Sequence, residues 1–526
     1  MTAKEFELKK PGEIRVRIAP SPTGYLHVGN ARTALFNYLF AKEQEGSFVL
    51  RVEDTDLERS RTEYTDDILE ELKWLGINWT EGPDVGGNYG PYRQTERREL
   101  YSKYLKKLLE EKKAYYCFCS EEELETQRQY QMSQGMAPKY NGKCLNLSEE
   151  EVKKNLETGK PFVIRLKAVS KKISFVDLIR EKVEFDTGLI GDIVIAKGID
   201  SPLYNFAVVI DDYEMKISHV IRGEDHLSNT PKQILIQEAL GFPRPEYAHL
   251  PMLLGEDRSK MSKRHGDTSV LSYRKAGYLP EALVNFMALL GWNPGDEREI
   301  YSLASLVKEF SLDRVQKSGA VFNVKKLDFI NGFYIRQKSP EKLTELCLPF
   351  LLEAGFIKKD GVPKKNGSKK TEKLGIFEEE KTEYLIIDTG EGIGPEGLAK
   401  IIVLYQERLK KLSEISELAD FFFKDKLSFD IGLLKWKDMT EKEIKQSLEK
   451  AEKILNKVKE ENWSKENLES VLLPEAEKQG DRGRLLWPLR VALTGKEASA
   501  SPFEVAEVLG KERTLKRIKE AVKLIK

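Results

Sequence analysis

The chain of 526 residues has few cysteines, no long apolar segment and no excess of either charge. Four cysteines are too few for a disulfide framework in a chain of this length. Because no run of about 18 apolar residues occurs, no membrane span is indicated. The first ten residues also lack the apolar core of a secretory signal. These absences lead us to expect a cytoplasmic protein.

The balance of charge is also informative. Lysine and arginine number 86, and aspartate and glutamate also number 86, so the formal net charge is zero. The chain therefore has no overall attraction for nucleic acid, and any contact with RNA must use locally patterned basic surface. Its length exceeds what one hydrophobic core serves, which predicts several domains.

Apolar segments near the N-terminus alternate between two lengths. Short apolar runs predict strands at Ile14–Ile18 and Phe48–Val52, a longer apolar run predicts a helix around Ala34–Ala41, and a further helix is predicted near Tyr64–Leu75. After a polar, cysteine-containing stretch, apolar strand character returns at Phe206–Ile210 and His219–Ile221. Apolar strands separated by buried helices are typical of a parallel sheet covered on both faces. We predict one Rossmann-like α/β domain interrupted by an insertion.

Beyond residue 263 the pattern becomes largely helical. Thr440 and Glu443 have the spacing of a capping box, and apolar residues follow at helical spacing at Ile444, Leu448, Ala451, Leu455 and Val458. Seven lysines lie within residues 358–373, together with glycine and proline. This composition favours an exposed loop, with an RNA-contact loop as the alternative.

Two motifs far apart in the chain together suggest a binding site for a nucleoside triphosphate. Arg17-Ile-Ala-Pro-Ser-Pro-Thr-Gly-Tyr-Leu-His-Val-Gly-Asn30 runs from a strand through a tight turn to a helix start, where free N–H groups and the helix dipole attract phosphate. Lys260-Met-Ser-Lys-Arg264 is a short basic segment that supplies a second clamp for the departing pyrophosphate.

The pair of motifs resembles the HIGH and KMSKS signatures of class I aminoacyl-tRNA synthetases, and the intervening sequence resembles bacterial glutamyl-tRNA synthetases. Asn30 and Arg264 replace a histidine and a serine that are usual in these signatures. The resemblance implies a Rossmann-like catalytic domain with an α+β insertion and an all-α anticodon-binding region. Its domains would be 13–96 and 204–258 (catalytic), 97–203 (insertion), 259–341 (KMSKS-like loop and connecting helices) and 342–526 (anticodon-binding).

The resemblance also implies the reaction and its nucleotide contacts. Glutamate and ATP would form glutamyl-adenylate, and the glutamyl group would pass to the terminal ribose of tRNA, with Mg²⁺ accompanying ATP. By this resemblance His27, Lys260 and Lys263 would be catalytic. Gly29 and Asp225 would contact ATP beside His27 and Lys263.

A glutamate substrate requires cations for two carboxylates and an anion for its ammonium group. Arg17, Glu53 and Arg222 lie at the ends of three predicted strands, where α/β folds bind ligands. The resemblance assigns all three to glutamate, together with Ala19, Ser21 and Tyr204. The alternative for each arginine is a structural ion pair.

The predicted insertion contains Cys117, Cys119, Tyr140 and Cys144. Their spacing resembles a Cys-x-Cys…Tyr-x₃-Cys site for structural zinc in some glutamyl-type enzymes, and the alternative is a reduced loop without metal.

The resemblance implies that the insertion binds the acceptor end of tRNA and that Arg408, Arg490 and Ser499 contact the anticodon. The partner would be tRNA(Glu), with tRNA(Gln) left open, and the enzyme would be a monomer. Two alternatives are a glutaminyl-tRNA synthetase and a non-catalytic tRNA-binding protein. The first usually has Pro-Glu-Pro-Asn-Gly where this chain has Pro-Ser-Pro-Thr-Gly.

Overall fold

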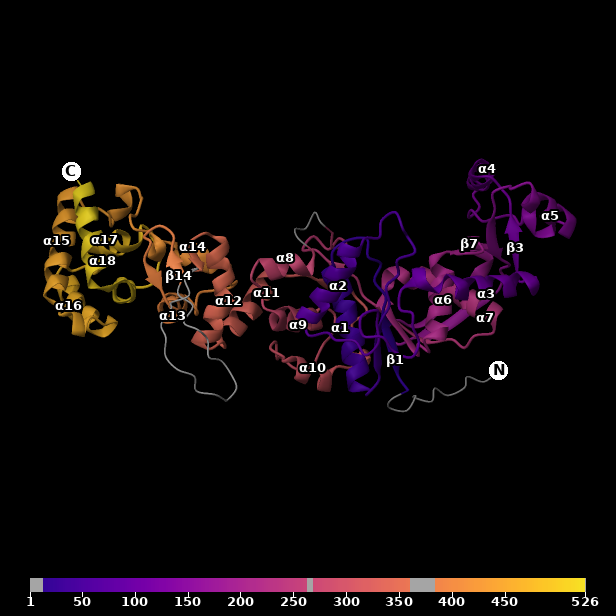
Figure 1. Ribbon diagram of the computed structural model, residues 1–526, viewed down its shortest axis with the longest axis horizontal. Coiled ribbons are helices and arrows are strands. Elements are labelled where there is room, and N and C mark those ends of the chain that lie inside the picture. The colour runs from indigo at the N-terminus through magenta and orange to yellow at the C-terminus, as the bar shows by residue number, and fades with distance from the viewer. Residues whose placement is uncertain (1–12, 263–267, 360–383, 526) are drawn as a thin grey trace, which may run out of the picture. The chain divides into compact units, whose positions relative to one another are not determined.

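The computed structural model describes residues 13–262, 268–359 and 384–525, which divide into two compact units (Figure 1). Unit 1 consists of the chain up to Arg274 together with Pro280–Ile330. Unit 2 consists of Lys275–Leu279 and the chain from Asn331 onward. The last of the three boundaries between the units along the chain falls within helix α11 (Val324–Arg336). Within the described ranges, no helix is both long and apolar enough to cross a membrane.

Parallel strands form the centre of unit 1. They are β1 (Arg15–Ile18), β2 (Ser47–Leu50), β9 (His219–Gly223) and β10 (Glu246–Leu250). β1 pairs with β2 and β9 pairs with β10, both in parallel. The Ser218 N–H donates to the Arg15 carbonyl at 2.9 Å and so joins the two pairs. The predicted parallel α/β core is confirmed, because its strands are buried and helices pack on it.

The predicted strand at Phe206–Ile210 is wrong. These residues lie inside helix α6 (Tyr204–Glu214), and Tyr204 is its first residue. All residues from Phe206 to Asp212 are buried, so the helix has no solvent-exposed face along this segment. A short run that is apolar on every side gives no periodicity by which a helix and a strand can be told apart.

Helices make up most of the rest of unit 1. Those of unit 1 outside the insertion are α1 (Val28–Glu43), α2 (Thr62–Trp74), α6, α7 (Thr230–Leu240), α8 (Val270–Lys275), α9 (Pro280–Leu289), α10 (Leu303–Glu309) and the first part of α11. A separate pair of parallel strands is formed by β11 (Leu253–Leu254) and β12 (Ala320–Val321). α1 lies against β1, β2 and β9. α1 therefore begins next to the ends of the central strands.

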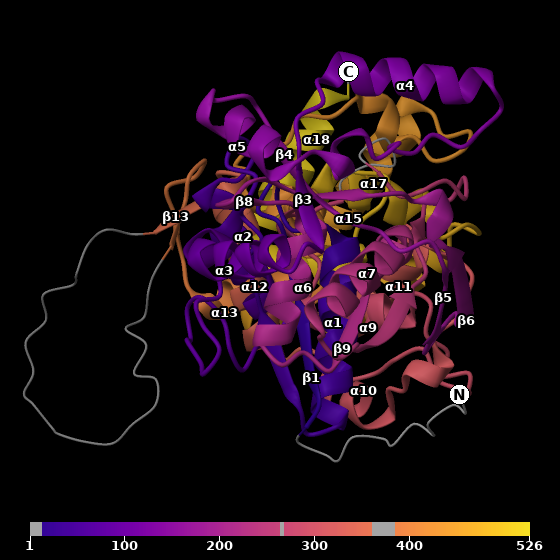
Figure 2. The same ribbon diagram turned by 90° about the vertical axis from the view of Figure 1, so that its right-hand side faces the viewer.

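The segment between the two halves of the core contains helices and antiparallel strands. Its elements are α3 (Arg98–Glu110), β3 (Ala114–Cys117), α4 (Glu121–Ser133), α5 (Glu149–Glu157), β4 (Val163–Leu166), β5 (Lys172–Asp177), β6 (Glu181–Asp186), β7 (Ile193–Gly198) and β8 (Ser201–Pro202). Strands β3, β4, β7 and β8 form one sheet in that order. The β5–β6 hairpin, whose two strands are labelled in Figure 2, instead joins the central sheet, since Asp177 pairs with Tyr247 of β10.

Unit 2 is mainly helical, as predicted. Its helices are the second part of α11, α12 (Pro340–Glu353), α13 (Pro395–Val403), α14 (Glu414–Ala419), α15 (Glu441–Lys457), α16 (Lys465–Glu477), α17 (Gly483–Thr494) and α18 (Pro502–Leu524). The capping box of Thr440 and Glu443 is present at the start of α15. A small antiparallel sheet adds β13 (Ile357–Lys359), β14 (Tyr384–Ile386) and β15 (Gly392–Ile393).

Candidate active site

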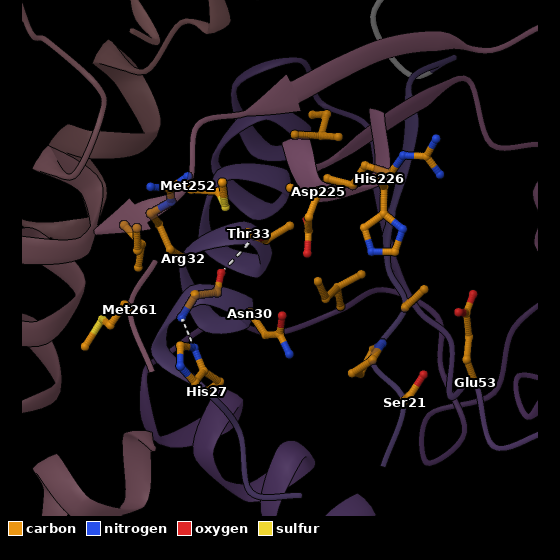
Figure 3. A pocket seen from close by; sticks show the side chains of 18 of the residues that line it. Ser21, His27, Asn30, Arg32, Thr33, Glu53, Asp225, His226, Met252 and Met261 are labelled. Carbon is orange, nitrogen blue, oxygen red and sulfur yellow. Dashed lines mark hydrogen bonds between the residues drawn. The ribbon is translucent and has the colours of Figure 1, made fainter. Parts of the chain in front are cut away.

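A pocket of about 450 Å³ opens where β1, β2 and β9 end and α1 begins (Figure 3). Ten of the eleven residues predicted for glutamate, ATP or catalysis line it. They are Arg17, Ala19, Ser21, His27, Gly29, Glu53, Tyr204, Arg222, Asp225 and Lys260. The eleventh, Lys263, lies outside the described residues, as does Arg264.

His27 is the N-cap of α1. Its Nδ1 accepts a hydrogen bond from the Gly29 N–H at 3.0 Å, so the proton of the neutral ring is on Nε2. Burial, and to a smaller extent Lys260, lowers the pKa of His27 and favours this neutral form. A Cβ on Gly29 would lie 3.1 Å from Nδ1, which explains why glycine suits this position. The cap therefore leaves an N–H donor at the mouth of the pocket.

Arg17 and Glu53 belong to one buried ionic network. Arg17 Nε lies 3.1 Å from Asp212 Oδ1, and Arg51 Nη2 lies 2.9 Å from Glu53 Oε1. Arg51 Nη1 also contacts Asp212 Oδ1 at 2.7 Å. Burial raises the pKa of Glu53, while Arg51 opposes this effect. Arg17 thus has the structural ion pair that was its alternative interpretation, and it also faces the pocket.

Arg222 differs from Arg17 because its hydrogen-bond partners are neutral side chains. Its Nη2 donates to Thr230 Oγ1 at 2.8 Å and its Nε to His249 Nε2 at 3.2 Å. Nη1 is buried, and within the described part of the chain it has no hydrogen-bond partner. The burial lowers the pKa of Arg222. A buried guanidinium with an open donor is suited to an anionic ligand, since an unsatisfied buried charge is costly.

His226 is a pocket residue that the sequence interpretation missed. Its Nδ1 lies 3.0 Å from the Tyr204 hydroxyl. Burial, followed by the charge of Arg222, lowers the pKa of His226 to about 4, so the ring is neutral at physiological pH. Burial also raises the pKa of Tyr204 to about 12. The position of His226 directly after Asp225 was the available signal in the sequence.

Lys260 and Asp225 form a loose pair at the outer side of the pocket. Lys260 Nζ lies 3.6 Å from Asp225 Oδ2, and the side chains are 63% and 49% exposed. Exposed pairs of this kind are weak, so Lys260 is free to exchange its partner for a phosphate.

The three predicted cysteine ligands also come together, in the antiparallel part of unit 1. The Sγ atoms of Cys117, Cys119 and Cys144 all lie within 4.8 Å of one another. The Tyr140 hydroxyl lies 3.4 Å from both Cys117 Sγ and Cys119 Sγ. Thiolates bound to one zinc ion at about 2.3 Å would be separated by a little under 4 Å, so this cluster fits a tetrahedral ion after small adjustments.

Comparisons with known proteins agree with this geometry. Residues 13–329 match the family model of the catalytic domain of class I tRNA synthetases (E and Q), and residues 342–522 match an anticodon binding domain. The chain belongs to the class I tRNA synthetases.

Individual relatives are similar over nearly their whole length. A glutamate–tRNA ligase of Caldicellulosiruptor saccharolyticus is 47% identical over 96% of this chain and 98% of its own. One of Carboxydothermus hydrogenoformans is 47% identical over 96% and 99%. A crystal structure of a glutamate tRNA ligase from Elizabethkingia meningosepticum in complex with its amino acid has a TM-score of 0.81 and 34% identity, with 98% and 100% coverage.

The second unit of the synthetase brings the three predicted anticodon residues together. Arg408 Nη1 donates to the Ser499 carbonyl at 2.6 Å. Burial and the nearby charge of Arg408 lower the pKa of Arg490. Arg490 Nε is buried without a hydrogen-bond partner among the described residues. Two arginines with little anionic compensation form a locally basic site in a chain of zero net charge.

A second basic feature of the synthetase lies on α3. A hollow of about 730 Å³ is lined by Arg98, Lys103, Lys106 and Lys107, together with two acidic residues of α3 and Asp200. The sequence interpretation did not single out these residues, although the spacing of three and four between Lys103 and the other two lysines was visible. Of the lysine-rich segment 358–373, only Lys358 and Lys359 are described, both in β13.

Proposed function

We propose that this chain is a glutamate–tRNA ligase that forms glutamyl-adenylate and transfers glutamate to tRNA(Glu). The observation that carries the proposal is Arg222, a buried guanidinium with an open Nη1 in a pocket formed by three strand ends. The class uses ATP, and the similar proteins over nearly the full length are glutamate–tRNA ligases.

The pocket offers a complementary group for each part of the reaction. Arg222 and Arg17 bind the carboxylates of glutamate, and Glu53 binds its ammonium group, with Ala19, Ser21 and Tyr204 forming the walls. The α-carboxylate oxygen attacks the α-phosphorus of ATP, and the bond to pyrophosphate breaks. The terminal ribose hydroxyl of tRNA then attacks the acyl carbon, and AMP leaves.

Catalysis in this scheme rests on positioning and charge stabilisation, because no protein nucleophile is needed. His27 donates from Nε2 to a phosphate oxygen, and Gly29 admits the nucleotide to the start of α1. Lys260 and Lys263 stabilise the departing pyrophosphate, and Asp225 borders the ATP site. Mg²⁺ is proposed to accompany ATP and to neutralise phosphate charge.

The decisive experiment compares glutamate with glutamine in tRNA charging. Neutral glutamine would leave the Arg222 guanidinium without its anion, so we expect kcat/KM to be about 10⁴-fold lower for glutamine. Arg222→Met should remove most of this preference while leaving the KM for ATP unchanged. Comparable values for both amino acids in the unmodified enzyme would contradict the proposal.

A structural zinc ion is proposed at Cys117, Cys119, Tyr140 and Cys144. The clustering of three Sγ atoms supports it, because zinc holds neighbouring loops by such tetrahedral sites. Metal analysis of purified protein should find about one zinc per chain. Cys119→Ser should lower this content, whereas Cys347→Ser, which changes a buried cysteine outside the cluster, should not.

Two surfaces are proposed to bind tRNA. The basic hollow on α3 supports contact with the acceptor end by the insertion, and Arg408, Arg490 and Ser499 support contact with the anticodon. Arg408→Ala should lower charging of tRNA(Glu) about 10- to 100-fold, because an arginine–base contact is lost. Arg484→Ala, on the same helix as Arg490, is the control, since Arg484 is paired with Asp438 and Glu443. Equal loss with all anticodon variants would argue against base reading.

Whether this enzyme also charges tRNA(Gln) is decided by measuring the attachment of glutamate to purified tRNA(Glu) and purified tRNA(Gln). The monomeric state and the cytoplasmic location stay predictions from the sequence. Sedimentation of the full chain tests the first of these.

A further inference from the structure

A buried aspartate–histidine pair stands behind Arg222. His249 Nδ1 lies 2.6 Å from Asp177 Oδ2, and both side chains are fully buried. On its other side, His249 Nε2 lies 3.2 Å from Arg222 Nε and 3.0 Å from the Thr230 hydroxyl. One imidazole therefore connects a carboxylate to the guanidinium of the pocket.

The surrounding hydrogen bonds fix the proton positions in this chain of groups. Asp177 accepts from the backbone N–H groups of Ile179, Arg180 and His249 at 2.8 to 3.1 Å, which favours its ionised form. His249 then carries its proton on Nδ1 and donates to Asp177. Its Nε2 is left as the acceptor for the Arg222 N–H, because a guanidinium can only donate.

We propose that Asp177 and His249 are positioning residues that orient Arg222 and balance its charge from a distance. A carboxylate in direct contact with Arg222 would compete with the carboxylate of the substrate. A carboxylate one imidazole ring away supplies compensating charge and leaves Nη1 open towards the pocket. This inference rests on the proposed function, and it extends that function by naming residues behind the pocket.

The inference also gives the insertion a role in amino-acid recognition. Asp177 is the last residue of β5, which belongs to the insertion but pairs with β10 of the central sheet. His249 lies on β10 and Arg222 on the neighbouring β9. The hairpin that extends the sheet therefore brings the carboxylate to the level of the pocket.

The test measures tRNA charging by full-length variants, with separate KM values for glutamate and ATP. Asp177→Asn should raise the KM for glutamate roughly 10- to 100-fold, because hydrogen bonds to a charged group are weakened. The KM for ATP should change little, and the preference for glutamate over glutamine should fall. His249→Gln, whose amide reaches the position of Nε2, should retain more of this preference than His249→Asn.

His219→Gln is the matched control, since His219 is a buried histidine of β9 that does not line the pocket. Thermal unfolding of all variants separates stability from binding. The inference is overturned if Asp177→Asn leaves the glutamate KM unchanged. It is also overturned if glutamate and ATP are affected equally, or if His249→Gln and His249→Asn behave like the control. A failure of the unmodified enzyme to charge tRNA with glutamate would instead overturn the proposed function.

Discussion

At the scale of single residues, His27 caps a helix with one ring nitrogen, and we propose that it contacts phosphate with the other. Its Nδ1 caps α1, and its Nε2–H is available to a phosphate. His27→Asn should preserve the cap, since Asn is a good N-cap residue, but should remove the donor. We expect the kcat for charging tRNA with glutamate to fall about 100- to 1000-fold, with little change in thermal stability. His27→Ala should lose about 1 kcal/mol of stability in addition.

These two substitutions separate the tasks of the ring. Equal activity of His27→Asn and the unmodified enzyme would show that the imidazole acts only as a helix cap. Equal stability of His27→Asn and His27→Ala would show that the cap contributes nothing measurable.

The role proposed for Glu53 predicts that glutamate binding depends on pH. Burial raises the pKa of this carboxyl, and only its ionised form attracts the substrate ammonium group. We therefore expect the KM for glutamate to rise as pH falls through this raised pKa. The effect on folding has the opposite sign, because a carboxyl with a raised pKa favours the folded state below its unfolded pKa and loses that contribution as pH rises. Measuring the KM for glutamate from pH 8 downward tests the effect on binding, and Glu53→Gln should remove the pH dependence of this KM.

Much of the pocket could be predicted residue by residue, because its wall residues lie within short motifs at strand ends. The groups behind the wall could not. Arg51 and Asp212 are 161 positions apart, and Asp177 and His249 are 72 apart. No local pattern marks such partners, since their contact exists only after the strands have been placed side by side.

At the scale of elements, α15 provides a quantitative test of sequence-derived helix signals. Thr440 Oγ1 accepts from the Glu443 N–H, and Glu443 accepts from the Thr440 N–H at 2.8 Å. Thr440→Ala removes one half of this box and should destabilise unit 2 by about 1 kcal/mol. The corresponding fall in the melting temperature is about 2–4 °C for a domain of this size. Thr440→Ser is the control and should retain stability, and charging at saturating tRNA should not change in either variant.

Elements were predictable where a pattern had both a period and an end signal. The capping box and apolar stripe of α15 have both. The fully apolar segment at Phe206–Ile210 has neither, and it forms a helix instead of the expected strand. The β5–β6 hairpin lies within the predicted α+β insertion, yet it pairs in parallel with β10 through Asp177. Such pairing is set by the packing of distant segments, which the local sequence does not contain.

At the scale of the whole molecule, a net charge of zero means that the binding of tRNA depends on local basic surface and not on overall attraction. The proposed contacts with phosphate use small basic groups such as the hollow on α3, and each such contact would release bound counterions. We expect the KM for tRNA to rise at least tenfold between about 50 and about 200 mM KCl. The KM for glutamate should change less than about twofold, because charges buried in the pocket are screened little.

The two KM values measured in one salt series separate the two kinds of electrostatics. Lys106→Ala and Lys107→Ala, which change the hollow on α3, should each reduce the slope of log KM for tRNA against log salt concentration by about one. Lys445→Ala, on α15 of the other unit, is the control for a surface lysine outside the hollow. If the KM for glutamate rises in parallel with the KM for tRNA, salt acts on the fold. If the slope is unchanged in both α3 variants, the phosphate contacts lie elsewhere on the molecule.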